Sequence, residues 1–110
     1  MQKKIHKALN EIGVPCGLLG RDYIEIAVEI ILQKGRQSIT YELYPAIAKK
    51  TGSKAHRVER AIRHAIERTF ETADPKQILE WFGNTLSLKS GKLANGDFLY
   101  GVVKHIQIYD

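Results

Sequence analysis

The chain has 110 residues, a formal net charge of +5 and a single cysteine, Cys16. This length fits one domain, residues 1–110, that buries its own core, and a lone cysteine excludes an internal disulfide and fits a reducing compartment. Because the sequence has neither an apolar run long enough to span a membrane nor a signal-peptide pattern, we expect a cytoplasmic protein without a membrane partner.

The positive charge is concentrated in the middle of the chain. Residues 36–70 carry eight basic and three acidic side chains, a net charge of +5. Residues 1–35 carry five basic and four acidic side chains, a net charge of +1. Residues 71–110 carry four basic and five acidic side chains, a net charge of −1. A basic patch confined to one segment is typical of a site for a polyanion. A membrane surface fits less well, because the arginine-rich stretch 56–67 has an apolar face without Trp or Phe.

The first third of the chain predicts two helices. Residues Lys3–Ile12 have apolar side chains at helical spacing and stop at Gly13. Residues Arg21–Lys34 form the most apolar segment, which ends at Gly35. Their β-branched side chains would also allow a strand, but the length of the segment and the i, i+4 spacing of its two glutamates favour a core helix.

A short helix is predicted next, from about Thr40 to Lys50. Ser38 and Thr40 are its candidate caps. Pro45 lies inside this stretch, and proline is tolerated only in the first turn of a helix. We therefore expect a kinked start, or a start displaced toward Tyr44.

The arginine-rich stretch 56–67 has two unlike faces when it is wound as a helix. The apolar face is small and consists of Val58, Ala61, Ile62, Ala65, Ile66 and Thr69. The opposite face consists of His56, Arg60, Arg63, His64 and Glu67, with Arg57 and Glu59 at the borders. Arginine can read guanine or clamp phosphate through its planar fork of donors. A solvated amphipathic helix would show the same pattern, so this helix alone leaves both interpretations open.

A break at Thr51–Ser53 separates these two helices, and Ser53 is the predicted cap of the second. A short helix, a tight turn with glycine and a longer helix with a basic outer face match a helix-turn-helix, here at about residues 40–69. Other helical hairpins share this pattern.

The last third of the chain predicts two more helices. A short one covers Gln77–Phe82, and Leu86–Leu93 reads as a loop, although a short hairpin also fits. Asn95 or Gly96 then caps a final helix from Asp97 to about Ile106. Six helices with short connections predict an all-α, six-helix domain that contains a helix-turn-helix.

The search for catalytic chemistry finds little. The four histidines are scattered and one cysteine cannot complete a structural zinc set. No glycine-rich phosphate loop is present, and Cys16 with a distant histidine is too weak a pair to predict a nucleophile. We expect no enzyme activity, no metal and no cofactor. Core packing is the better interpretation for Trp81 and for Phe82 individually, although partial exposure of one would suit a protein contact.

Three stretches of the chain resemble the C-terminal effector domain of the stage-zero sporulation master regulator of endospore-forming Firmicutes. They are Glu11–Pro15, Leu43–Lys50 and, most specifically, Arg57–Glu67. Weaker support comes from Phe82-Gly83 with Thr85, and from Asn95 with Phe98. The resemblance covers nearly the whole chain.

The resemblance implies a six-helix transcription regulator whose helix-turn-helix binds promoter boxes in double-stranded DNA, often in tandem copies. Such a protein activates some genes through the sigma factor of RNA polymerase and represses others. The implied base contacts are made by Arg57, Glu59 and Arg60. We expect backbone or supporting contacts from Lys49, Lys50, Ser53, Lys54, His56, Arg63 and His64. The resemblance further implies sigma-factor contact by Phe82 and Leu86 and pairing of neighbouring protomers near Val103.

The chain departs from the family pattern at several positions. His56 stands where a small hydroxyl residue is common, Glu25 where Arg is frequent and Leu93 where the loop has Pro. No receiver domain is present, so we expect an excised effector domain or a stand-alone relative. Two rival functions stay open: a protein-interaction module that has lost promoter binding, and a non-specific nucleic-acid binder. We also expect a monomer in free solution that self-associates on tandem sites, because no long apolar seam suits a constitutive dimer.

Overall fold

The computed structural model describes residues 1–83 and 93–109, and within these ranges the chain forms six α-helices, one short π-helix and no strand. The all-α, six-helix prediction is confirmed. The elements are α1 (Gln2–Ile12), α2 (Leu19–Lys34), η1 (Ile39–Leu43), α3 (Tyr44–Thr51), α4 (Ala55–Thr72), α5 (Pro75–Phe82) and α6 (Asn95–Tyr109). None of these helices is long and apolar enough to cross a bilayer.

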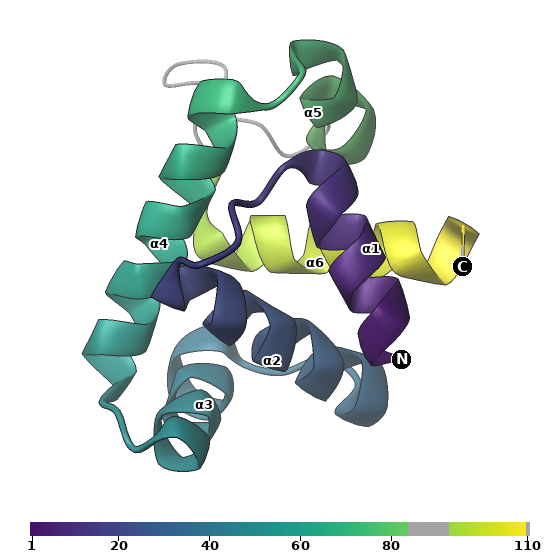
Figure 1. Ribbon diagram of the computed structural model, residues 1–110. Coiled ribbons are helices and arrows are strands. Elements are labelled where there is room, and N and C mark those ends of the chain that lie inside the picture. The colour runs from purple at the N-terminus through teal and green to yellow at the C-terminus, as the bar shows by residue number, and fades with distance from the viewer. Residues whose placement is uncertain (84–92, 110) are drawn as a thin grey trace.

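Helix α2 occupies the middle of the fold and packs against α1, α3, α4 and α6. Figure 1 shows α4 standing along one side with α3 at its lower end, while α1 lies across α6. Helix α5 packs on α6 at the top of this view. The two helices of the helix-turn-helix therefore form one edge of the molecule, and the rest of the fold supports them from behind.

The glycines predicted to stop the first two helices do so. Gly13 ends α1 in the left-handed conformation with φ of 90°, and Gly35 ends α2 with φ of 82°. These backbone conformations favour glycine because it has no Cβ to clash. Helix α2 begins at Leu19, two residues before the predicted start, and the strand alternative for this segment is wrong.

The displaced start expected for the third helix is also confirmed. Helix α3 begins at Tyr44, with Pro45 in its first turn, and the π-helix η1 occupies the five residues before it. Ser38 caps η1: its Oγ accepts from the N–H of Tyr41 at 3.3 Å, and its own N–H donates to Glu42 Oε1 at 2.8 Å. This reciprocal pair resembles a capping box. Of the two candidate caps, Ser38 therefore caps η1, whereas α3 has Leu43 at its N-cap, without a side-chain hydrogen bond.

Both ends of α4 and both ends of α6 differ from the prediction. The cap of α4 is Lys54, without a side-chain hydrogen bond, because its carbonyl oxygen accepts the first helical bond, from the N–H of Val58 at 3.0 Å; Ser53 lies outside α4 and donates its N–H to Ala48 O at 2.9 Å. Helix α4 continues to Thr72, and the side chain of buried Thr69 bonds within it, its Oγ1 donating to Ala65 O at 2.7 Å. Helix α6 begins at Asn95 rather than at Asp97, and runs on to Tyr109.

The core between α4, α5 and α6 is aromatic. Phe82 is only 2% exposed and stacks on Phe98 with ring centroids 5.1 Å apart, and Phe70 lies 6.5 Å from Phe82. Gly101 makes room for this packing, because a Cβ there would collide with the Phe82 ring. Burying one such side chain contributes about 1.5–3 kcal/mol, so Phe82, together with buried Ile78, holds α5 to the body.

Candidate nucleic-acid interface

The turn between α3 and α4 has the compact geometry of a helix-turn-helix. Helix α3 ends at Gly52, which has φ of 71°, and α4 begins three residues later. Tyr44, Ile47 and Ala48 are the buried residues of α3. The apolar face predicted for α4 is confirmed, with Val58, Ile62, Ala65, Ile66 and Thr69 buried and Ala61 half-buried. Both helices thus turn mainly apolar residues inward and leave their basic residues outside.

Gly20 lets α2 approach the back of α4 closely. A Cβ at this position would overlap the carbonyl oxygen of Ala61 and would lie 2.8 Å from the Cβ of Ala65. Only glycine fits, so the first turn of α2 presses directly on the backbone of α4. The sequence analysis did not predict this role for Gly20.

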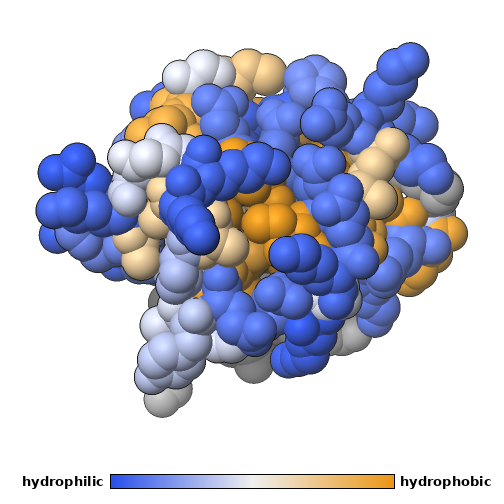
Figure 2. Space-filling model, turned by 90° about the horizontal axis from the view of Figure 1, so that it is seen from below, coloured by the Kyte–Doolittle hydropathy of each residue, from blue (hydrophilic) through white to orange (hydrophobic). Residues whose placement is uncertain are grey.

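Most of the predicted DNA-contacting side chains are exposed together on this edge. The exposed members of the predicted set on α4 are His56, Arg57, Arg60, Arg63 and His64. Those on α3 and in the turn are Lys49, Lys50 and Lys54. Seen from below, the side of the molecule where α3 and the start of α4 lie is covered mainly by hydrophilic side chains, and an apolar patch is visible nearer the centre (Figure 2). Ser53 is half-buried in the turn. The arrangement offers arginine forks and lysine charges to an anionic partner.

Glu59 lies at the border of this surface and not at its outermost part. Its half-exposed carboxylate pairs with Arg63 Nη1 at 3.2 Å, one helical turn further on. An exposed pair of this kind contributes about 0.2–0.5 kcal/mol. Its backbone carbonyl accepts from Asn95 Nδ2 at 3.1 Å. In the free protein Glu59 is therefore already engaged, both through its side chain and through its backbone.

The same Asn95 amide also donates to the hydroxyl of Tyr44, at 2.9 Å. Burial raises the pKa of Tyr44, and the hydrogen bond from Asn95 opposes this shift in part. The phenol therefore stays neutral over the physiological range and serves as an acceptor. Sequence patterns gave no indication of this contact, which joins the first turn of α6 to both helices of the helix-turn-helix.

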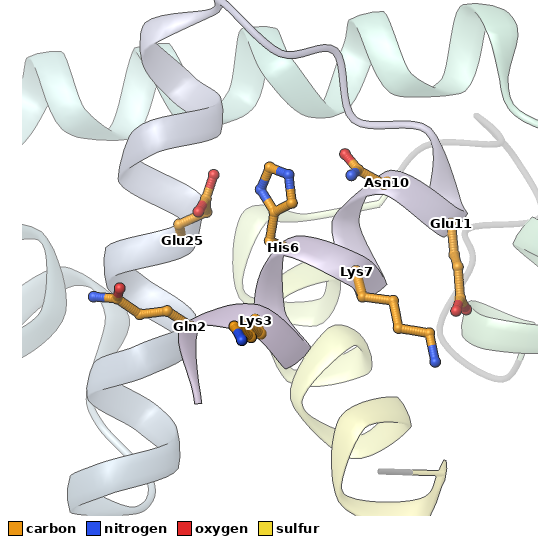
Figure 3. A pocket seen from close by; sticks show the side chains of 7 residues that line it. All are labelled: Gln2, Lys3, His6, Lys7, Asn10, Glu11 and Glu25. Carbon is orange, nitrogen blue, oxygen red and sulfur yellow. The ribbon is translucent and has the colours of Figure 1, made fainter.

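A second polar cluster lies between α1 and α2, centred on Arg21. This side chain is 1% exposed and donates to Val14 O at 2.7 Å, to Glu25 Oε2 at 2.9 Å, to Asn10 Oδ1 at 3.1 Å and to His6 Nδ1 at 3.1 Å. Figure 3 shows His6, Asn10 and Glu25 directed toward one space between the helices, with Lys7 and Glu11 pointing elsewhere. A buried charge with this many acceptors ties α1 to α2. Glu25, one of the departures from the family pattern, is thus part of a structural cluster.

The residues implied in protein contacts have mixed surroundings. Phe82 and Val103 are buried, 2% and 5% exposed, whereas Leu79 on α5 and Ile108 on α6 are each 60% exposed. Trp81 is half-buried and stacks on His105 with centroids 3.6 Å apart. Leu86 lies outside the described residues. Sigma-factor contact and protomer pairing stay predictions, and Phe82 and Val103 lie beneath the surface that would carry them.

A family model described as "Sporulation initiation factor Spo0A C terminal" matches residues 5–106. The matched range runs from α1 into the last turn of α6 and includes the whole helix-turn-helix.

Proposed function

The chain belongs to the family of sporulation initiation factor Spo0A C-terminal domains, the DNA-binding domain of a sporulation regulator, and on that premise we propose that it binds promoter boxes sequence-specifically through α3 and α4. The observation that carries the proposal is the exposed arginine-rich face of α4 on a helix backed closely by α2 at Gly20. The first turns of a recognition helix usually enter the major groove. Arg57 and Arg60, both in the N-terminal half of α4, suit that place.

The side chains divide into two roles in this proposal. Arg57, Glu59 and Arg60 read base edges: arginine pairs with guanine and a carboxylate accepts from the amino group of cytosine. The supporting residues contact phosphates or orient the readers, and they are Lys49, Lys50, Ser53, Lys54, His56, Arg63 and His64. The charges of the three lysines and of Arg63 supply affinity that depends on salt but not on sequence.

Selection from a pool of randomised duplexes tests the proposal. We expect one short preferred box, bound roughly 10³–10⁷ times more tightly than a scrambled duplex, which is the usual range for specific binding. Equal affinity for both duplexes would instead support a non-specific binder. Absence of binding to either would support an interaction module that has lost DNA recognition.

Two protein contacts complete the proposed function. The surface of α5 and the segment after it, with Phe82 and Leu86, would contact the sigma factor of RNA polymerase, and α6 near Val103 would pair neighbouring protomers on tandem boxes. Because Phe82 is buried, it would act by supporting that surface. Exposed Leu79 offers an apolar side chain on the same short helix. A regulator of this kind works in the cytoplasm.

A further inference from the structure

Helix α6 is joined to the helix-turn-helix by polar contacts from its first two turns. Tyr100 Oη accepts from the N–H of Gln37 at 2.9 Å and donates to the carbonyl oxygen of the same residue at 2.7 Å. One phenol hydroxyl thus holds both backbone groups of Gln37. The guanidinium of Arg36 lies over the Tyr100 ring, 4.9 Å from its centroid, and adds a cation–π contact.

Gln37 stands immediately before Ser38, the cap of η1, so Tyr100 fixes the entrance to the helix-turn-helix. The second tie is made by Asn95, whose amide donates to Tyr44 Oη and to Glu59 O. These two acceptors lie at the start of α3 and in the second turn of α4. Together, Tyr100 and Asn95 hold Gln37, α3 and α4 to the N-terminal end of α6.

We propose that Tyr100 and Asn95 are positioning residues for base reading, forming a polar brace that sets the placement of α3 and α4. The inference rests on the proposed function. Hydrophobic packing against α2 at Gly20 fixes how closely α4 is held from behind, but apolar contacts have no direction. Hydrogen bonds do have direction, so the brace sets how the helix is turned and shifted. Base edges are read by short, directional contacts that a small displacement weakens, whereas phosphate contacts through long lysine side chains tolerate it.

The test uses Tyr100→Phe, which removes one hydroxyl and keeps a ring under Arg36. The quantity measured is the ratio of dissociation constants for a scrambled duplex and for the single preferred box selected by the unchanged protein. We expect this ratio to fall about three- to tenfold, the effect of losing a hydrogen bond, with unchanged affinity for the scrambled duplex. The Gln37 amide should exchange about tenfold faster in an NMR hydrogen-exchange experiment, for the same reason.

Tyr109→Phe is the matched control, because Tyr109 lies on the same helix, is 66% exposed and keeps its ring contact with His105 after the change. It should leave the ratio unchanged. Asn95→Ala should lower the ratio of dissociation constants as Tyr100→Phe does. It should change the exchange of the Gln37 amide little, because Asn95 contacts Tyr44 and Glu59 and leaves the Tyr100–Gln37 bonds in place.

The outcomes separate the inference from the proposed function. Tyr100→Phe and Asn95→Ala could both lower the midpoint of thermal unfolding and leave the ratio of dissociation constants unchanged. That result would mean that Tyr100 and Asn95 only stabilise the fold, and it would overturn the inference but not the proposed function. Failure of the unchanged protein to select any preferred box would overturn the proposed function, and the inference with it. A fall in the ratio confined to Tyr100→Phe and Asn95→Ala would support both.

Discussion

Glu59 carries a negative charge in the N-terminal half of α4, where the exposed side chains are otherwise basic. A carboxylate near DNA is repelled by phosphates, so its presence on a reading helix calls for a compensating contact, such as a cytosine amino group. The structure shows a different contact in the free protein, the 3.2 Å pair with Arg63. The ion pair with Arg63 would prevent Glu59 from contacting a base only if the pair persisted when DNA is bound. Because an exposed pair is weak, binding to a base could replace it.

Substituting Glu59 decides between these interpretations. If Glu59 reads a base, Glu59→Ala should accept new bases at one position of the selected box, with little loss of overall affinity because a repulsive charge is removed. If it only pairs with Arg63, the selected box should not change. Arg57→Ala should relax a different position and cost about 1–3 kcal/mol of discrimination there. Binding-site selection with each variant is the measurement.

Lys50→Ala is the comparison for these two variants. It removes an exposed charge at the end of α3, so it should weaken all sequences alike and reduce the salt dependence of binding by about one phosphate contact. An unaltered preferred box for both Arg57→Ala and Glu59→Ala would show that base reading lies elsewhere.

At the scale of elements, the crossing of α2 and α4 is the contact on which the recognition helix depends. Gly20→Ala places a methyl group against the Ala61 carbonyl and within 2.8 Å of the Ala65 Cβ. Backbone cannot yield as a flexible side chain can, so the helices must separate. We expect a loss of about 1–3 kcal/mol in the free energy of unfolding, as overpacking usually costs, measured by urea denaturation.

Leu19→Ala is the control for this change, because Leu19 is the neighbouring residue in the first turn of α2 and is 59% exposed. It should change the free energy of unfolding by less than about 0.5 kcal/mol, as surface substitutions usually do. Equal stabilities for the unchanged protein and Gly20→Ala would mean that α2 and α4 are not in the close contact described.

Local sequence signals predicted most of the elements and the exposed basic face. The signals at Gly13, Gly35 and Pro45 are local, because each one starts or stops a helix through its own backbone conformation. Their effect can therefore be predicted from the neighbouring sequence. Ser53 was misassigned as a cap because α4 begins one residue later than a capping serine would place it, and the residue that takes the cap position, Lys54, has no capping side chain. The brace could not be predicted, because Tyr100 and Gln37 are 63 residues apart, and Asn95 and Tyr44 are 51 apart. Contacts of this kind exist only once the helices have packed.

At the scale of the whole molecule, surface chemistry decides how copies of the chain associate. Among the described residues, the exposed large apolar side chains are Met1, Leu19, Tyr41, Leu79, Ile108 and Tyr109. In residues 1–83 and 93–109 they form no continuous stripe along one helix of the kind that a constitutive helical dimer needs. The net charge of +5 adds mutual repulsion between free copies. Under the proposed function DNA would offset both effects, because its phosphates would neutralise the charge and two boxes would hold two copies close together.

We therefore predict a monomer in free solution and cooperative binding to tandem boxes. Binding of one copy gives the second an effective concentration that reaches about the millimolar range for closely held sites, so even a weak contact through α6 becomes populated. Sedimentation at micromolar concentration without DNA should give the mass of one chain. Titration of a duplex with two boxes should show tighter binding of the second copy than of the first, and a single-box duplex is the control. Inserting about half a helical turn, roughly five base pairs, between the boxes should abolish the effect because it places the copies on opposite faces of the duplex. A tight dimer in free solution, or cooperativity that ignores the spacing, would contradict this account of pairing.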